Sequence, residues 1–307
     1  MSLKISVIVP SYNGAHKLPN ILSSLSRQSF NDFETIVVLD GSTDNSLEIL
    51  ENTDFGLKNL KIINQANGGR SVSRNNGAKT AEGELLVFFD DDVRLLNNCI
   101  EKHWKHYLHY QDCILVGNVP EDLAVMKNDF QFFKANLSRK WVENLPDSNI
   151  RLSKKNLFLT AANLSIKKEL FWCLGGFDEK LTDSEDYDLG VKALLKDVPI
   201  YFDINNIVWH DDFITCRSYV IRSRQYSLSH KKLKELKPEL YNEEFTQYDY
   251  RQVKGFKKAV YSFFGRSFWV KLIDSNKWLL FPPKKLRYKI YDFVITSLSA
   301  HSPNRKI

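Results

Sequence analysis

The sequence predicts an α/β fold in which a mainly parallel central sheet is flanked by helices and followed by a basic, aromatic-rich helical C-terminal extension. Over residues 4–115, short apolar runs rich in β-branched residues alternate with helical patterns, which is typical of βαβ units. After residue 212 the pattern becomes helical and rich in Lys, Arg, Phe, Tyr and Trp. We therefore expect a first domain at 1–212 and a helical region at 213–307.

The expected strands are apolar runs bounded by turn-forming residues. They lie at 5–9, 34–39, 60–63, 84–89, 113–116, 157–166, 200–202 and 207–210. Between the first two, apolar residues recur at helical spacing from Leu18 to Leu25, and Pro19 falls in the first turn, where its missing N–H is harmless. A further helix is expected at 185–195. Residues 117–155 show little periodicity and are interpreted as an inserted region.

The net charge of +6 conceals an asymmetry along the chain. Residues 217–307 hold 20 Lys and Arg against 7 Asp and Glu, a net charge of +13, which leaves −7 for residues 1–216. An acidic first part suits a metal site, and a basic aromatic tail suits an anionic surface such as lipid headgroups or a polyanionic substrate. No segment resembles a nucleic-acid-binding module, so we expect no nucleic acid partner.

The composition favours a cytoplasmic protein. The four cysteines show no metal-ligand spacing and are expected to be reduced core thiols. The chain enters its first strand without a signal-peptide pattern, and no window holds eighteen uninterrupted apolar residues, so we expect no membrane span. In the tail, Phe256, Val260 and Phe263 recur at helical spacing among lysines. This pattern predicts either a helix lying on the inner face of the plasma membrane or a helical cap on the first domain.

Three consecutive acids, Asp90, Asp91 and Asp92, follow the apolar run 84–89. They are expected at the carboxyl end of a buried parallel strand, where open α/β sheets place their ligands. Three carboxylates at one strand tip repel one another, and a divalent cation that carries a phosphorylated ligand would relieve this repulsion. A solvated acidic turn is the alternative for an isolated pair of acids.

Two earlier strands also end in residues that can bind a nucleotide. The first runs into Pro10 and Tyr12, whose ring offers a stacking face, and the second ends in Asp40, which can accept a hydrogen bond from a base N–H, with Asp44 four residues later. Surface packing of Tyr12 and simple helix capping by the acids are the alternatives. Further on, Arg70 and Arg74 share one face near a helix N-terminus, an arrangement that can hold a diphosphate, although exposed arginines on helices are commonly just solvated.

These residues resemble family 2 glycosyltransferases of the GT-A fold over roughly residues 4–211. The matching segments occur in the family's order at 6–13, 38–46, 67–77, 88–93, 175–178 and 184–186. The resemblance implies transfer of a sugar, with inversion, from a nucleoside-diphosphate sugar with uridine as the base. The resemblance further implies a glycan or lipid-linked hydroxyl as the acceptor, in cell-surface polysaccharide or glycolipid assembly, with 117–155 on the acceptor side. The candidate donor-binding residues are Pro10, Tyr12, Asp40, Asp44, Arg70, Arg74, Asp90 and Asp91.

The resemblance also assigns roles to the acids. Asp40 contacts the nucleobase, and Asp90 and Asp92 form a D-x-D pair in which Asp92 is the direct ligand of Mn²⁺ or Mg²⁺ and Asp90 faces the ribose or sugar. The middle residue of the family's D-x-D motif is neutral, whereas here it is Asp91. This difference leaves open which of the three acids points inward. His210, at the end of a strand, is a candidate third metal ligand or diphosphate contact, or a structural histidine.

Glu185 and Asp186 match the family's acceptor-side acid motif, which makes Asp186 the catalytic base and Glu185 its supporting residue. A sugar hydroxyl is a poor nucleophile until a carboxylate takes its proton, and a well-placed base contributes roughly 10² to 10⁴ in rate. The alternative is that the acids at 183–188 only stabilise a helix N-terminus.

Two other functions share part of this pattern. A haloacid-dehalogenase-type phosphatase also has D-x-D after an apolar strand, but there the pair sits on an early strand and leads into a threonine-bearing turn, whereas Val93 and Arg94 follow here. A non-catalytic nucleotide-sugar-binding protein is the second alternative. A dinucleotide-binding dehydrogenase is disfavoured because no G-x-G-x-x-G follows the first strand.

Overall fold

The structure, a computed structural model, describes residues 3–143, 145, 148–211, 213–241, 254–276 and 282–307. The chain forms two compact units. One comprises residues 1–121 with 144–212, and the other 122–143 with 213–307. The second unit therefore takes in a helix from the region 117–155, which we had expected to lie wholly in the first domain.

The first unit is built on a mixed sheet with strand order β3-β2-β1-β4-β8-β6-β9-β5 and β7 paired to β9. The pairs β1–β2, β2–β3, β1–β4 and β6–β9 are parallel, whereas β8 runs antiparallel to β4 and β6. The strands are β1 (Ile5–Ser11), β2 (Phe33–Asp40), β3 (Leu60–Gln65), β4 (Leu85–Phe89), β5 (Val93–Leu95), β6 (Ile114–Asn118), β7 (Asn149–Arg151), β8 (Asn163–Lys167) and β9 (Ile200–His210). The expected α/β class is confirmed.

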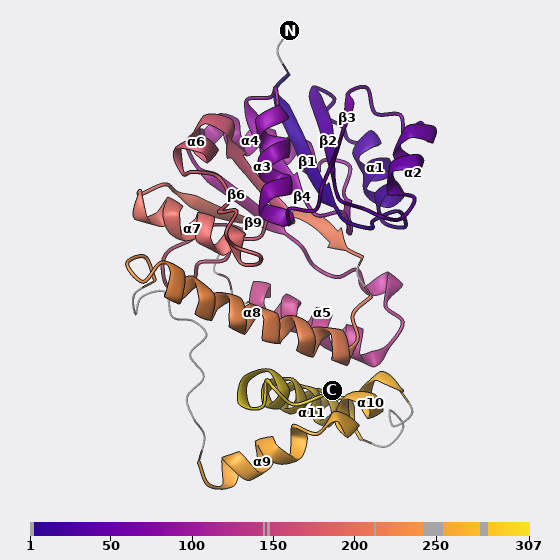
Figure 1. The fold of residues 1–307 in the computed structure, drawn as a ribbon, viewed down its shortest axis with the longest axis vertical. Coiled ribbons are helices and arrows are strands. Elements are labelled where there is room, and N and C mark those ends of the chain that lie inside the picture. The colour runs from indigo at the N-terminus through magenta and orange to yellow at the C-terminus, as the bar shows by residue number, and fades with distance from the viewer. Residues whose placement is uncertain (1–2, 144, 146–147, 212, 242–253, 277–281) are drawn as a thin grey trace. The chain divides into compact units, whose positions relative to one another are not determined.

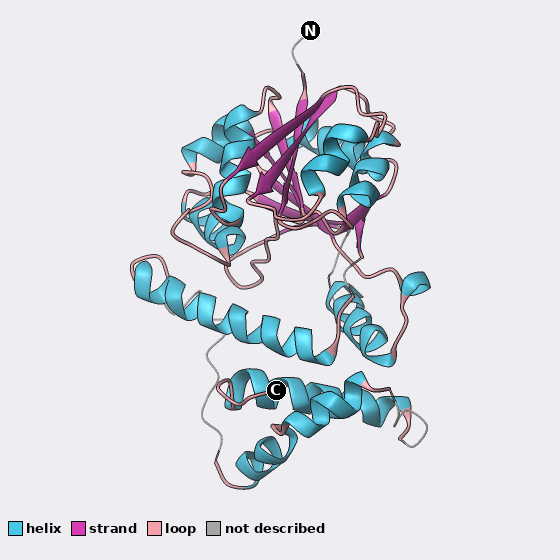
Figure 2. Ribbon diagram, turned by 45° about the vertical axis from the view of Figure 1, so that its right-hand side comes forward, coloured by secondary structure: helices cyan, strands magenta, loops and turns pink. Residues whose placement is uncertain are grey.

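Helices flank this sheet (Figure 1), and the strands lie between them in Figure 2. They are α1 (Leu18–Ser26), α2 (Ser46–Asn52), α3 (Arg70–Thr80), α4 (Cys99–Tyr110), α6 (Lys168–Cys173) and α7 (Glu185–Leu195). Side chains alternate across β1: Val7 and Val9 join the core formed with α1, while Ile8 lies beside Gly77 of α3. A Cβ on Gly77 would come within 2.5 Å of Ile8, so this glycine lets α3 pack closely on the sheet.

Several strand boundaries differ from the sequence expectation. The run 157–166 forms a strand only from Asn163, and the two runs 200–202 and 207–210 are joined in the single strand β9. The short strand β5 was not expected. It pairs antiparallel with the last residues of β9, so that Val93 lies opposite His210. The residues directly after the three acids are thereby fixed to the end of β9.

The second unit is helical. It contains α5 (Asp129–Glu143), α8 (Cys216–Leu236), α9 (Phe256–Phe264), α10 (Ser267–Asp274), α11 (Lys284–Thr296), a 3₁₀ turn at Leu123–Val125 and a π-helical segment, η3, at Ser297–His301. Phe130 and Phe133 of α5 are buried in one cluster with Tyr291 and Val294 of α11, which explains why α5 belongs to this unit. None of the helices in the described residues combines the length and the apolar composition needed to cross a lipid bilayer.

Candidate active site at the carboxyl edge of the sheet

The loops after β1 and β2 are tied together by hydrogen bonds. The backbone N–H of Thr43 donates to Asn13 Oδ1 at 2.8 Å, and the N–H of Asn13 donates to Ser42 Oγ at 3.0 Å. Asp44 accepts from the N–H of Ala15 at 3.0 Å. Beside this junction, Tyr12 is 56% exposed, so its ring is available to stack on a ligand. Pro10, the penultimate residue of β1, is partly buried.

Asp40 holds the glycine turn that precedes α3. Its Oδ1 accepts from the N–H of Gly68 and its Oδ2 from that of Gly69, both at 2.8 Å, and Gln65 Nε2 donates to Oδ1 at 2.9 Å. Gly69 has φ of +86°, a conformation that a residue with a side chain rarely adopts. The buried carboxylate thus fixes the turn, and these three donors leave about one of its four lone-pair sites for a further hydrogen bond.

The three consecutive acids do not point the same way. Asp91 turns inward: Ser11 Oγ donates to its Oδ2 at 2.6 Å, and Lys17 Nζ lies 3.2 Å from its Oδ1. Burial raises the pKa of Asp91 above its usual value, although Lys17 and Ser11 partly oppose this effect. Asp91 is therefore held by the last residue of β1 and by the residue that precedes α1, which leaves Asp90 and Asp92 as the acids that face the edge of the sheet.

Asp92 lies beside His210. Lys17 Nζ is 3.4 Å from Asp92 Oδ2, and His210 Nε2 is 3.8 Å from Asp92 Oδ1. Oδ1 is buried and has no hydrogen-bond partner among the described residues. β9 runs in the same direction as β4, because β8 lies antiparallel between β4 and β6 and β6 is parallel to β9. Asp92 and His210 therefore meet at the carboxyl edge of the sheet.

Arg74 joins the two acidic motifs of the sequence. It is only 3% exposed, and its guanidinium donates to Asp90 Oδ1 and to Glu185 Oε1, each at 2.5 Å. Burial alone would raise the pKa of Asp90, but Arg74, with Arg70, holds that pKa below its usual value. Arg70 itself is more exposed and lies 3.6 Å from Asp183 and 4.0 Å from Glu185. The two arginines thus differ: Arg74 is an internal bridge, and only Arg70 faces solvent.

Asp186 lies in the first turn of α7, directly after Glu185. Ser184, the N-cap residue of α7, has φ of +61°, so the chain enters this helix through a left-handed residue. Burial, followed by the adjacent charge of Glu185, raises the pKa of Asp186 to about 7, against the opposing effect of Arg74. A carboxylate whose pKa lies near neutral pH is suited to accept a proton from a hydroxyl.

Three residues that shape this site have no role in the sequence prediction. Ser11 and Lys17 hold Asp91. Asn75 of α3 binds the loop before α7: its Nδ2 donates to the carbonyl of Phe177 at 2.8 Å, and its Oδ1 accepts a hydrogen bond from the Phe177 N–H at 3.1 Å. Asn75 lies in the segment 67–77 that carried the family resemblance. Its bidentate use of the Phe177 backbone could not be read from the pattern, because the two residues are 102 positions apart.

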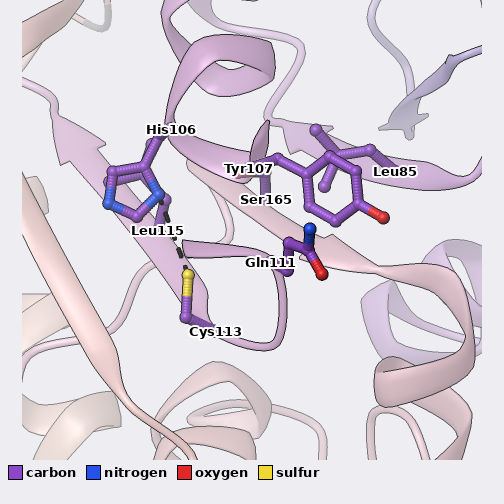
Figure 3. Close-up of a pocket in the computed structure, with 7 residues that line it drawn as sticks. All are labelled: Leu85, His106, Tyr107, Gln111, Cys113, Leu115 and Ser165. Carbon is purple, nitrogen blue, oxygen red and sulfur yellow. Dashed lines mark hydrogen bonds between the residues drawn. The ribbon is translucent and has the colours of Figure 1, made fainter. Parts of the chain in front are cut away.

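A separate pocket adjoins α4 and the strands β4, β6 and β8 (Figure 3). Cys113 Sγ lies 3.8 Å from His106 Nδ1 in this pocket. Burial raises the pKa of the Cys113 thiol to about 12 and lowers that of His106 to about 4. Both groups are therefore neutral near pH 7, and the pair lacks the thiolate that a reactive cysteine needs. The remaining lining residues are Leu85, Tyr107, Gln111, Leu115 and Ser165.

The chain belongs to glycosyl transferase family 2, whose model matches residues 6–175. It is 29% identical over 216 residues to an uncharacterized glycosyltransferase of Haemophilus influenzae, which covers 70% of each chain. It is 37% identical over 115 residues to the glycosyltransferase GlyA of Streptococcus pneumoniae, 38% of this chain but only 16% of GlyA.

Solved structures share the fold over nearly the whole chain. The mannosyltransferase PcManGT of Pyrobaculum calidifontis, in complex with GDP-Man and Mn²⁺, is similar over 100% of this chain and 89% of that chain, with a TM-score of 0.62 and 16% identity. S. aureus TarS 1–349, in complex with UDP-GlcNAc, is similar over 98% of this chain and 92% of that chain, with a TM-score of 0.56 and 21% identity. The GT-A fold expected from the sequence is thereby confirmed.

Proposed function

We propose that this glycosyltransferase moves a sugar from a nucleoside-diphosphate sugar, with UDP as the nucleotide, to an acceptor hydroxyl with inversion of the anomeric carbon. The observation that carries the proposal is Arg74, which joins Asp90, on the side of Asp92 and His210, to Glu185, the neighbour of Asp186. A candidate cation site and a candidate base are thereby held in one network. The proposed acceptor is a glycan or a lipid-linked saccharide on the cytoplasmic side, in cell-surface polysaccharide or glycolipid assembly.

The residues present fit a divalent cation. Asp92 Oδ1 is a buried carboxylate oxygen without a hydrogen-bond partner among the described residues, and His210 Nε2 lies 3.8 Å away. The described part of the chain holds no group of three or more His, Cys, Asp or Glu side chains arranged to bind a metal. Because Mg²⁺ is usually held by one or two carboxylates together with waters and substrate phosphates, Asp92 suffices as the carboxylate ligand of a cation that is shared with the donor. When bound, the metal neutralises the charge that develops on the leaving diphosphate.

The donor is assigned to the loops after β1, β2 and β3. Tyr12 offers its exposed ring to the base beside Pro10, Asp40 accepts a hydrogen bond from the base, and Asp44 fixes the loop that carries Asn13 and Ala15. Arg70, which is 42% exposed at its side chain, is the proposed phosphate contact. Two structures with this fold are complexes with UDP-GlcNAc and GDP-Man, which supports a nucleotide sugar as the ligand class.

Asp186 is the proposed base. As the acceptor oxygen forms a bond to the anomeric carbon, its proton passes to Asp186, and the bond from that carbon to the diphosphate breaks with its electron pair leaving on the diphosphate. Glu185 orients this part of α7 through its ion pair with Arg74. A single displacement needs no covalent glycosyl-enzyme, so the configuration at the anomeric carbon inverts.

The phosphatase alternative is not retained, because the family is a glycosyltransferase family and Asp90, the first acid of the D-x-D pair, is bound to Arg74 rather than free to attack phosphorus. Experiment distinguishes the proposed enzyme from a protein that binds a nucleotide sugar without catalysis. A thermal-shift panel of UDP, GDP and their sugars, each with and without Mn²⁺, identifies the donor. We expect one nucleotide to stabilise the protein only with metal, by about 2.7 kcal/mol at a hundredfold excess over its Kd.

Slow metal-dependent hydrolysis of the identified donor sugar then distinguishes an enzyme from a binding protein. Asp186→Asn is the matched control, since it keeps the side-chain shape but removes the base. We expect wild type to hydrolyse the donor and the variant to bind it without turnover. No metal-dependent shift with any nucleotide would contradict the proposal, and binding without turnover by wild type with donor and acceptor would support the non-catalytic alternative.

A further inference from the structure

Helix α9 of the C-terminal unit has two apolar faces, of which one packs inside the unit and the other is largely exposed. Phe264 stacks on Phe293 of α11 with ring centroids 5.2 Å apart and planes at 10°. Tyr261 lies 4.2 Å from the ring of His301. These contacts fix the rotation of α9 on α11 and η3, and they account for one side of the helix.

The other face of α9 turns aromatic side chains to solvent. Phe256 is 84% exposed and Phe263 is 47% exposed. They are seven residues apart, which places them on one side of the helix, with Ala259 between them. Phe268 of α10 is 61% exposed, and both it and Phe263 lie against Trp269, at 5.8 and 5.5 Å. We call Phe256, Phe263 and Phe268 the aromatic face.

The segment that carries the aromatic face is basic. Residues 254–273 contain five Lys or Arg and no Asp or Glu. Lys257, Lys258 and Lys271 are exposed, and the Arg266 guanidinium lies 5.5 Å from the Phe263 ring. Leaving exposed aromatic rings in water costs free energy. Such rings, in a segment whose charged residues are all basic, match the interface of an anionic membrane, where the rings enter the acyl region and the cations contact the headgroups.

We propose that the aromatic face inserts into the interface of an anionic lipid membrane and anchors the protein peripherally. Charge complementarity identifies the partner: each Lys or Arg close to an anionic membrane strengthens binding roughly fivefold, whereas a neutral apolar partner would gain nothing from the five cations. A soluble polyanion would satisfy the cations but would leave the three rings in water. The anchoring is independent of the proposed transfer reaction and goes beyond it.

Vesicle flotation of the full-length protein tests the proposal without donor or acceptor, so its outcome is separate from that of the proposed function. The vesicles are phosphatidylcholine alone or phosphatidylcholine with about one third phosphatidylglycerol. We expect wild type to float with the anionic vesicles, to float at least tenfold less with neutral ones, and to be released by high salt. Sedimentation of wild type free of anionic vesicles would overturn the proposal.

Two variants locate the surface. The first is a triple variant that combines Phe256→Ser, Phe263→Ser and Phe268→Ser, and it should bind anionic vesicles at least tenfold more weakly than wild type. The control is Leu108→Ser, at a 57% exposed position of α4, which should bind the vesicles as wild type does. All four positions are exposed, so unchanged thermal unfolding is expected. Equal binding by the triple variant and wild type would overturn the assignment, as would equal loss in both variants. Heparin at matched ionic strength serves as the competitor. If heparin displaces wild type completely from the vesicles, if the triple variant still binds heparin in the absence of vesicles, and if lipid adds nothing to the binding of wild type, the partner is a polyanionic glycan. This combination of results would refute the membrane proposal.

Discussion

Replacement of Arg74 by Gln tests whether the buried bridge between the two acidic motifs holds the site together. Arg74 is 3% exposed and neutralises Asp90 and Glu185, of which Glu185 is 2% exposed. Removing one partner of a buried ion pair leaves an uncompensated charge and typically costs about 3 to 5 kcal/mol. For a domain of this size, about 2 to 4 °C per kcal/mol corresponds to a fall in Tm of about 6 to 20 °C.

The matched control is Arg70→Gln, on the same helix and one turn away. Arg70 is 42% exposed at its side chain and lies 3.6 and 4.0 Å from its acidic neighbours, so its loss should cost less than about 1 kcal/mol. Differential scanning calorimetry of both variants measures the difference. A Tm of Arg74→Gln within 2 °C or so of the Arg70→Gln value would refute the view that Arg74 is a buried structural bridge.

The remaining predictions concern catalysis. Asp186→Asn should lower turnover by about 10² to 10⁴ while leaving donor affinity nearly unchanged, measured by steady-state kinetics and calorimetric titration. Since Asp186 must be deprotonated to act as a base and its pKa is raised to about 7, kcat should rise with pH through about 7 and level off above it; a rate independent of pH from 5 to 8 would argue against this base. Asp92→Asn should abolish Mn²⁺-dependent donor binding, whereas Asp91→Asn, which alters an inward-facing side chain, should retain most of it; equal loss in both would contradict the different orientations of the two acids.

Much of the fold and of the site could be predicted because both depend on local pattern. Buried parallel strands such as β2 and β4 are continuous apolar runs, and the acids that follow them fall at one edge of the sheet by topology alone. For the same reason the sequence places Asp40 and Asp92 at that edge, whereas for His210 it predicts only the end of a strand. Their roles in binding a donor or a metal stay predictions.

What could not be predicted depends on contacts between distant parts of the chain. Nothing in three adjacent aspartates shows that Asp91 faces inward, because its orientation is set by Ser11, 80 residues earlier. Arg74 was expected to grip a diphosphate from its position on a helix, but its partner Glu185 is 111 residues away. Similarly, α5 joins the C-terminal unit because Phe130 and Phe133 pack on α11, which no local periodicity could reveal.

The most direct test is a crystal structure of the full-length protein with Mn²⁺ and the nucleotide identified by thermal shift, examined by anomalous scattering at the manganese edge. The proposal predicts one manganese ion bound by an Asp92 oxygen, with His210 and the nucleotide diphosphate beside it and the base next to Tyr12. Manganese or nucleotide bound elsewhere, with Asp92 still paired only to Lys17 and His210, would contradict it.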